Sequence, residues 1–145
     1  MYPEPRCWFP SLQPMADTPE YPTDKQPSIR RMLMPRDTNA LGTIFGGVIL
    51  AEIDLAAAIE AEKHHAGRVV TVAMDRIVFH DPVFLGDIVS FFTDTQRIGR
   101  TSVTVEVCVW AHRARQSGGP VQVTEAQVTL VAVDEEFHPT PLNRV

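Results

Sequence analysis

The chain has 145 residues, a length that suits one domain and leaves little room for a second. Its formal net charge of −5 gives no overall basic footprint for nucleic acid, and no apolar run reaches the ~18 residues that a membrane span needs. The two cysteines, Cys7 and Cys108, are too few for a disulfide framework, so the sequence predicts a reducing compartment and a cytoplasmic protein.

Proline is concentrated at the start of the chain. Seven of the 12 prolines fall within residues 1–27, and no glycine precedes Gly42. Because proline fixes φ and donates no backbone hydrogen bond, we predict that residues 1–27 form no regular element and are either disordered or draped over the surface. The folded domain is then expected to cover residues 28–142, followed by a short tail of residues 143–145.

The first elements of this domain are a strand and a helix. Residues 28–34 are predicted to form a short strand, residues 36–45 a polar loop and residues 46–64 a helix. The helix is apolar on nearly every side, and such a helix is buried rather than amphipathic. It must therefore be wrapped by a sheet, or lie between a sheet and a partner.

Strand-like runs with a period of two follow the helix. They cover residues 68–79, 86–96, 101–114 and 121–134. Turn residues separate these runs, and in the last run the alternation shifts between Val123 and Ala126, which indicates a bulge. We therefore predict an α+β fold in which a meander of antiparallel strands curls around one central helix.

Gly46 and Gly47 stand at the predicted start of this helix. The first N–H groups of a helix have no intrahelical acceptor and carry the positive end of the helix dipole. Because a glycine has no Cβ, a ligand oxygen can approach these groups, so the pair is suited to act as an oxyanion hole. The alternative is that both glycines serve only capping and packing.

Asp54 is the second candidate, because it lies on the helix between Ile53 and Leu55 and close to three alanines. A buried carboxylate is costly unless it is paired or used in chemistry, so we expect either a catalytic role or a pairing with a buried arginine or backbone N–H groups. Asp54 is seven residues beyond Gly47, or about 10 Å along the helix axis. If both act on one substrate, one of them must come from a neighbouring copy, which predicts a symmetric dimer with two sites at its interface.

The residues around this helix resemble a known motif. The motif reads Asn39-x-x-Gly42-x-x-Phe45-Gly46-Gly47, then Asp54. It is similar to that of hotdog-fold acyl-CoA thioesterases, in particular the YciA-like group of bacterial acyl-CoA hydrolases. The similarity continues through residues 68–74, 80–82, 86–87, 97–102 and 130–134, and so covers about residues 29–141. This resemblance implies a hotdog fold, in which a five-stranded antiparallel sheet wraps around one long helix, a two-fold dimer, and further assembly into tetramers or hexamers.

The resemblance also implies roles for residues at matching positions. Asp54 corresponds to the carboxylate that activates water or attacks the thioester, and Asn39 to the loop amide that holds the water or the thioester. The N–H of Gly47, with that of Gly46, corresponds to the donor that polarises the carbonyl. The implied reaction is hydrolysis of acyl-CoA to a fatty acid and coenzyme A.

Thr43 departs from this pattern, because the YciA-like group has an acid at this position. A threonine cannot act as a general base at neutral pH. Either Asp54 carries the chemistry with Asn39, or the protein binds or senses acyl-CoA without hydrolysing it. An acyl dehydratase on the same fold needs a His at the helix start, where this sequence has none, and is the least favoured interpretation.

Coenzyme A carries phosphates, so basic residues are expected near its site despite the acidic total. Arg97 and Arg100 flank a predicted turn, and the hydroxyls of Thr101 and Ser102 follow. In the resembling family this segment lies near the nucleotide end of coenzyme A, and an ordinary charged hairpin is the alternative. Thr71 is a further candidate near the thioester.

Other kinds of site have no signal in the sequence. No spacing of His or Cys indicates a metal, and neither a Gly-x-Ser-x-Gly element nor a phosphate-cradling or dinucleotide-binding loop is present. The sequence therefore argues against a serine-hydrolase mechanism and predicts no metal, no cofactor, and no nucleic-acid or membrane partner.

Overall fold

The computed structural model describes residues 19–113 and 118–143, and all structural statements below concern these residues. A short 3₁₀ turn, Pro35–Asp37, precedes the helix. The regular elements are β1 (Ile29–Met32), α1 (Gly46–Ala61), β2 (Arg68–Phe79), β3 (Ile88–Ile98), β4 (Ser102–His112) and β5 (Val121–Val133). Every expected element is present, although the helix ends three residues earlier than predicted.

The strands form one antiparallel sheet in the order β1-β3-β4-β5-β2. β3, β4 and β5 form a meander as predicted, but β2 pairs with β5 at the far edge, and the chain crosses the sheet between β2 and β3. The prediction of a meander that includes β2 is therefore wrong. Alternation along a strand shows which side chains share a face, but it does not identify the neighbouring strand.

The predicted bulge in the last strand is confirmed. Val109 of β4 lies opposite Thr124, and Trp110 lies opposite Gln122, so Val123 is left over on β5. Edge strand β2 has two further register shifts against β5. These irregularities bend the long strands, as a sheet that curves over a helix requires.

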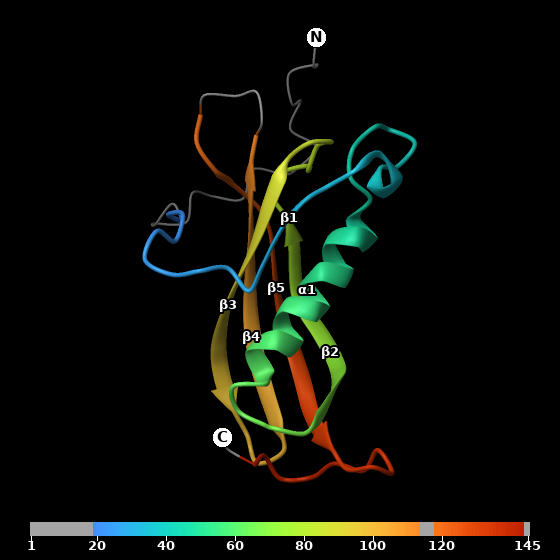
Figure 1. Cartoon of the computed structure of the whole chain (residues 1–145), viewed down its shortest axis with the longest axis vertical. Helices are drawn as coiled ribbons and strands as arrows, with labels where there is room; N and C mark the ends of the chain where they lie inside the picture. Colours follow the sequence, from blue (N-terminus) through green and yellow to red (C-terminus); the bar gives the residue numbers. More distant parts are fainter. Residues whose placement is uncertain (1–18, 114–117, 144–145) are drawn as a thin grey trace.

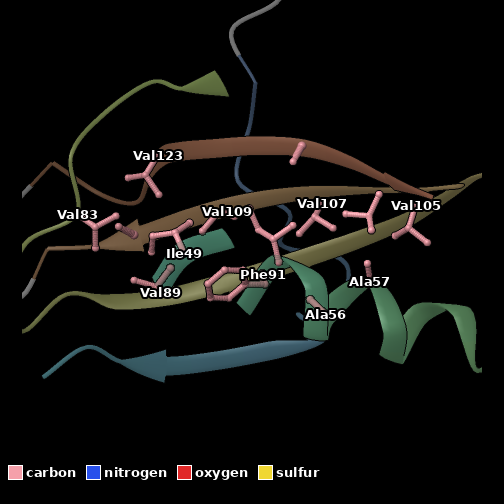
Figure 2. Packing of buried hydrophobic residues seen from close by; sticks show 14 of the residues in the cluster. Ile49, Ala56, Ala57, Val83, Val89, Phe91, Val105, Val107, Val109 and Val123 are labelled. Atoms are coloured by element: carbon pink, nitrogen blue, oxygen red, sulfur yellow. The ribbon is translucent and has the colours of Figure 1, made fainter. Parts of the chain in front are cut away.

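Helix α1 lies across one face of the sheet (Figure 1). Ile53, Ala56 and Ala57 are completely buried on the side of the helix that faces the strands. Figure 2 shows the two alanines on this side, with Val105 and Val107 of β4 also directed into the core. Because alanine side chains are short, the helix axis can approach the sheet closely here.

One side of α1 is left uncovered by the described residues. Ala51, Leu55 and Ile59 follow one another at intervals of four residues, and all are exposed, Leu55 to 56% and Ile59 to 43%. The sheet therefore does not wrap the helix completely. Of the two predicted alternatives, a helix between a sheet and a partner fits the structure, because an exposed apolar stripe of this kind is typical of an association surface.

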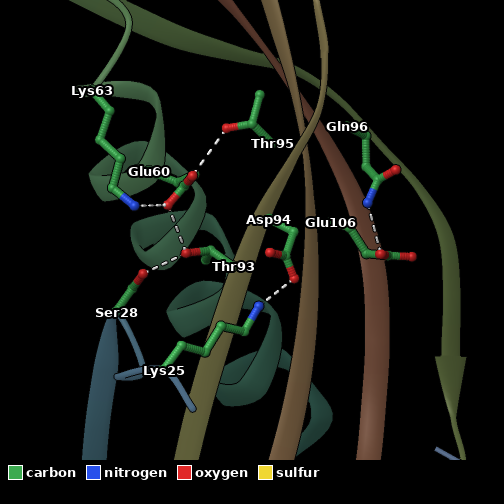
Figure 3. Close-up of polar contacts among 9 residues, drawn as sticks. All are labelled: Lys25, Ser28, Glu60, Lys63, Thr93, Asp94, Thr95, Gln96 and Glu106. Carbon is green, nitrogen blue, oxygen red and sulfur yellow. Dashed lines mark hydrogen bonds and ion pairs between the residues drawn. The ribbon is translucent and has the colours of Figure 1, made fainter. Parts of the chain in front are cut away.

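A polar network that the sequence analysis did not predict fixes the last turn of α1 to β3 (Figure 3). The Glu60 carboxylate, only 5% exposed, accepts hydrogen bonds from Thr93 (3.0 Å), Thr95 (2.9 Å) and Lys63 (2.6 Å). Burial alone raises the pKa of Glu60, but the hydrogen bonds from Lys63, Thr95 and Thr93 outweigh it, so the pKa lies below its usual value. The structure therefore holds Glu60 in its ionised form.

The described part of the predicted N-terminal tail, residues 19–27, contacts the outer face of the sheet. The Tyr21 ring packs edge-on against Phe92 and Trp110, with ring centroids 5.4 and 5.6 Å apart. Phe92 alternates with the core residue Phe91, so it points away from α1. Residues 1–18 lie outside the described residues, and the division of the chain into a tail and a domain stays a prediction.

Candidate active site

The loop before α1 brings the chain to the helix in a fixed geometry. The N–H of Phe45 donates to the carbonyl of Asp37 (2.9 Å), and the N–H of Val48 donates to the carbonyl of Phe45 (2.9 Å). The N–H groups of Gly46 and Gly47 have no acceptor among the described residues. Two free donors therefore stand at the positive end of the helix dipole, an arrangement that stabilises a developing oxyanion.

The two glycines also have a packing role. A Cβ on Gly47 would clash with the ring of Phe45, and one on Gly46 would touch the ring of Phe79 at 3.4 Å. A Cβ points outward from the helix, whereas the N–H groups point along its axis toward the start. The packing role and the donor role are therefore compatible, and the structure supports the first without opposing the second.

Asp54 lies in the middle of α1 and faces the edge strand β2. Its Oδ1 atom accepts a hydrogen bond from the hydroxyl of Thr71 at 2.5 Å. The sequence predicts a carboxylate in apolar surroundings, but in the single chain Asp54 is half-buried, next to the exposed Leu55. The predicted candidates Asp54 and Thr71 are thus brought together, whereas Gly47 remains about 10 Å away along the helix.

Asn39 and Thr43 close the loop between the 3₁₀ turn and α1. The Asn39 side-chain amide donates to the Thr43 hydroxyl (2.9 Å), and its oxygen accepts the N–H groups of Leu41 (2.9 Å) and Thr43 (3.2 Å). Gly42, at φ 81°, occupies the left-handed region that such a tight turn requires. In the single chain, the polar groups of Asn39 are therefore engaged within its own loop.

A second group of residues, which sequence reasoning missed, fastens this loop to the helix. Arg31 of β1 forms ion pairs with Asp37 (3.2 Å) and with Glu52 of α1. Glu52 could have been noticed in the sequence, because it is an acid on the same apolar helix as Asp54. Its position in the sequence, however, does not indicate that its partner is an arginine on β1.

The predicted coenzyme A residues lie at the other end of the molecule. The turn between β3 and β4, which carries Arg97 and Arg100, lies at the end of the sheet where α1 finishes (Figure 1). The side chains of both arginines are exposed, and neither forms an ion pair with a described residue. The 16-residue helix separates this turn from Gly46 by about 24 Å, so the single chain does not bring the arginines to the helix start.

Among the described residues, no group of three or more His, Cys, Asp or Glu side chains is placed to hold a metal ion. Within residues 19–113 and 118–143, no helix is long and apolar enough to cross a membrane.

A curved five-stranded sheet on one helix, with free donors at the helix start and a carboxylate halfway along it, defines a class of protein. The family model described as the thioesterase superfamily matches residues 41–117, more than half of the chain. The chain therefore belongs to the thioesterase superfamily.

Individual proteins show which members of the superfamily this chain resembles. The acyl-CoA thioester hydrolase YciA of Escherichia coli is 39% identical over 116 residues, which are 79% of this chain and 88% of that protein. An uncharacterized acyl-CoA thioester hydrolase of Zymomonas mobilis is 41% identical over 114 residues, or 79% of this chain and 76% of that protein. The crystal structure of a hexameric hotdog fold thioesterase of Campylobacter jejuni has a TM-score of 0.78 and 44% identity, covering 82% of this chain and 91% of that chain. These findings confirm the hotdog fold and the resemblance to the YciA-like group.

Proposed function

We propose that this protein is an acyl-CoA thioesterase, which hydrolyses the thioester of a fatty acyl-CoA to a free fatty acid and coenzyme A. One observation carries the proposal: Asp54, held by Thr71, lies on the same helix whose first two N–H groups have no acceptor in the described chain. The relatives that share the fold and about 40% of the sequence are acyl-CoA thioester hydrolases by name, which supports the same substrate class.

In the proposed reaction, the thioester carbonyl oxygen accepts hydrogen bonds from the N–H of Gly47, with that of Gly46, where negative charge develops. The Asp54 carboxylate takes a proton from a water molecule that attacks the carbonyl carbon, or it attacks that carbon itself. The C–S bond then breaks, and coenzyme A leaves as the thiol. On the general-base route the thiolate takes up the proton that Asp54 removed from water, and the fatty acid is formed in the same step. On the nucleophilic route an acyl–Asp54 anhydride is left, and water then hydrolyses it to the fatty acid and the free Asp54 carboxylate while the proton released neutralises the thiolate. Asn39 holds the water or the thioester.

The smallest active unit is proposed to be a homodimer. Gly47 and Asp54 of one chain are about 10 Å apart, too far to act on one carbonyl group. Two antiparallel α1 helices that cross near Ala51, where the exposed stripe of Ala51, Leu55 and Ile59 begins, bring the helix start of one chain next to Asp54 of the other. Assembly of such dimers into a tetramer or a hexamer is in keeping with the hexameric Campylobacter jejuni relative.

Antiparallel pairing also gives the basic turn a role. Because this turn lies where α1 ends, it approaches the helix start of the partner in such a dimer. We propose that Arg97 and Arg100 bind phosphate groups of coenzyme A, with the hydroxyls of Thr101 and Ser102 beside them. Their lack of carboxylate partners among the described residues supports this role, since an arginine that is already paired binds phosphate less well.

The catalytic domain is proposed to be residues 28–142. The segments 1–27 and 143–145 contain no residue with an assigned catalytic role. A cytoplasmic location is proposed as well, because two cysteines cannot form a disulfide framework.

A second candidate function is binding or sensing of acyl-CoA without hydrolysis. Thr43 favours it, because its hydroxyl occupies the position where the YciA-like pattern has an acid, and this hydroxyl is hydrogen-bonded to Asn39. Under this alternative, acyl-CoA binds tightly but no coenzyme A is released.

Coenzyme A release distinguishes the two functions. Acyl-CoAs of graded chain length are incubated with the full chain, and free thiol is followed with a chromogenic reagent. Burial, with the nearby Glu106 and Glu125, raises the pKa of the Cys108 thiol to about 11, so this group stays protonated near neutral pH and adds little background. Binding without release at every chain length would overturn the thioesterase and leave the binding protein.

The first prediction concerns Asp54. Asp54→Asn keeps the shape of the side chain but removes its basicity, so we expect kcat to fall by at least ~10²-fold. Asp75→Asn, at an exposed acid on β2, is the matched control and should retain the wild-type rate. A wild-type kcat for Asp54→Asn would refute the assigned role.

A further inference from the structure

A single arginine ties the loop that carries Asn39 to the helix that carries Asp54. The Arg31 Nη2 atom lies 3.2 Å from Oδ2 of Asp37, and Nη1 contacts Oε1 of Glu52. The side chains of Asp37 and Glu52 are only 10% and 12% exposed, and that of Arg31 is 29% exposed. This ion-pair set is therefore shielded from solvent, unlike an ordinary surface salt bridge.

Asp37 connects Arg31 to both ends of the loop. Its Oδ2 atom also accepts the N–H of Met34 (2.9 Å), and its carbonyl oxygen accepts the N–H of Phe45 (2.9 Å). Between these points, Thr38 and Ile44 pair as an antiparallel bridge. These hydrogen bonds around Asp37, together with the bridge between Thr38 and Ile44, form a frame that holds the tip of the loop with Asn39.

Glu52 connects Arg31 to the helix. It lies two residues before Asp54 on α1. An arginine guanidinium can hold two carboxylates at once through its planar fork, whereas a lysine ammonium presents a single point of charge. Without Arg31, two poorly solvated carboxylates would be left close together, and each would be costly.

We propose that Arg31 is a positioning residue of the thioesterase: it fixes the Asn39 loop relative to helix α1, and thereby relative to the free N–H donors of Gly46 and Gly47 at the helix start. This inference rests on the proposed function. Arg31 forms no hydrogen bond or ion pair with Asn39, Gly47 or Asp54, so it acts through Asp37 and Glu52. The expected consequence is on the alignment of the reacting groups, not on the affinity for acyl-CoA.

Arg31→Met and Arg30→Met form a matched pair for the test. Arg30 directly precedes Arg31 in β1 and points to the opposite face, where it donates to Ser90 (2.9 Å) and Tyr21 (2.8 Å). We expect Arg31→Met to lower kcat by about 10-fold or more, with KM changed by less than about 3-fold, because a small misplacement of catalytic groups is costly in rate. Arg30→Met should leave both constants within about 2-fold. Equal kcat values for the two variants would overturn the proposal.

Glu52→Gln keeps the test decisive if Arg31→Met does not fold. It removes one charge but leaves the pair of Arg31 with Asp37, so a smaller fall in kcat, about 3-fold, is expected. Where Arg31→Met folds, combining it with Glu52→Gln should cost no more than Arg31→Met alone, because the contact is already broken. Where it does not fold, a wild-type kcat in both Glu52→Gln and Arg31→Lys would overturn the proposal.

Hydrogen exchange separates the failure of this inference from the failure of the proposed function. The amides of Thr43 and Phe45 are hydrogen-bonded in the frame and should exchange faster in Arg31→Met than in Arg30→Met. If the wild-type chain releases no coenzyme A, the thioesterase proposal fails but this measurement still applies. Equal exchange in the two variants shows that Arg31 does not hold the loop.

Discussion

Thr71 determines how the Asp54 side chain is oriented. Its hydroxyl donates to Oδ1 at 2.5 Å, and Oδ2 has no hydrogen-bond partner among the described residues. One oxygen of the carboxylate is thus anchored, while the other is the one that takes a proton or attacks the carbonyl carbon in the proposed reaction. Such anchoring is what a general base or nucleophile requires, because the rate depends on the geometry of the attack.

Replacing Thr71 tests this anchor. Thr71→Val has nearly the same shape but lacks the hydroxyl, so Asp54 loses its donor, and we expect kcat to fall by about 10-fold. Thr71→Ser keeps the hydroxyl and should stay within about 3-fold of the wild-type kcat. Steady-state kinetics measure both, and urea unfolding verifies that both variants are folded. If valine and serine variants had equal rates, the hydroxyl would have no part in the reaction.

At the scale of elements, helix α1 is connected to three strands through three carboxylates. Glu52 pairs with Arg31 of β1, Asp54 accepts from Thr71 of β2, and Glu60 accepts from two threonines of β3. Apolar packing holds the helix against the sheet without fixing its rotation strongly, because it is non-directional. Hydrogen bonds and ion pairs are directional, so these three contacts determine which residues of α1 face each strand.

The prediction at the scale of elements concerns the contribution of the Glu60 carboxylate to stability. The pKa of Glu60 is lowered in the folded chain, so the ionised form stabilises the fold at neutral pH, and this contribution is lost as the pH falls through the lower folded-state pKa. Glu60→Gln should therefore lose about 1–3 kcal/mol of unfolding free energy at neutral pH, because buried donors lose a charged acceptor.

The pH dependence distinguishes this account from a simple packing defect. The difference in unfolding free energy between wild type and Glu60→Gln should shrink when urea unfolding is repeated below pH 4. Glu62→Gln, at an exposed acid just beyond the helix, is the control and should change stability by less than about 0.5 kcal/mol. A difference that stays constant from neutral to acid pH would contradict the role of the ionised carboxylate.

At the scale of the whole molecule, one chain carries the residues of the proposed site but does not bring them together. The free donors lie at one end of α1, Asp54 lies in its middle, and the basic turn lies at its other end. The same helix exposes Leu55 and Ile59 along one side. Both observations are explained together if a second copy covers this side with its own α1 in the opposite direction.

Hybrid dimers test this arrangement. Asn39→Ala and Asp54→Asn are each expected to be nearly inactive, but a hybrid of the two contains one intact site if Asn39 of one chain works with Asp54 of the other. Random pairing of equal amounts then restores about a quarter of the wild-type activity. Two differently tagged copies of Asp54→Asn, expressed together, are the control and should stay inactive. Hybrids without restored activity would place both residues in one site of one chain.

The residues of the proposed site could be singled out because they stand out locally in the sequence. Asp54 is an acid on an apolar helix, Gly46 and Gly47 open that helix, and Asn39 lies in the loop before it. The same reasoning overlooked Glu52 and Glu60, although they lie on the same helix. A carboxylate that pairs with a distant strand and one that is available for chemistry have the same appearance in a sequence, since their partners are 21 to 35 residues away.

By itself, the sequence determined the elements, their bounds to within a few residues and the faces of the strands, because periodicity, turn residues and bulges are properties of neighbouring residues. It also determined that Gly47 and Asp54 cannot meet in one chain, since helical rise is constant. Only the tertiary structure decided that β2 pairs with β5, that Thr71 thereby reaches Asp54, and that Arg31 joins the loop to the helix. These contacts depend on how distant segments pack, and the free energy of that packing is a property of the whole fold.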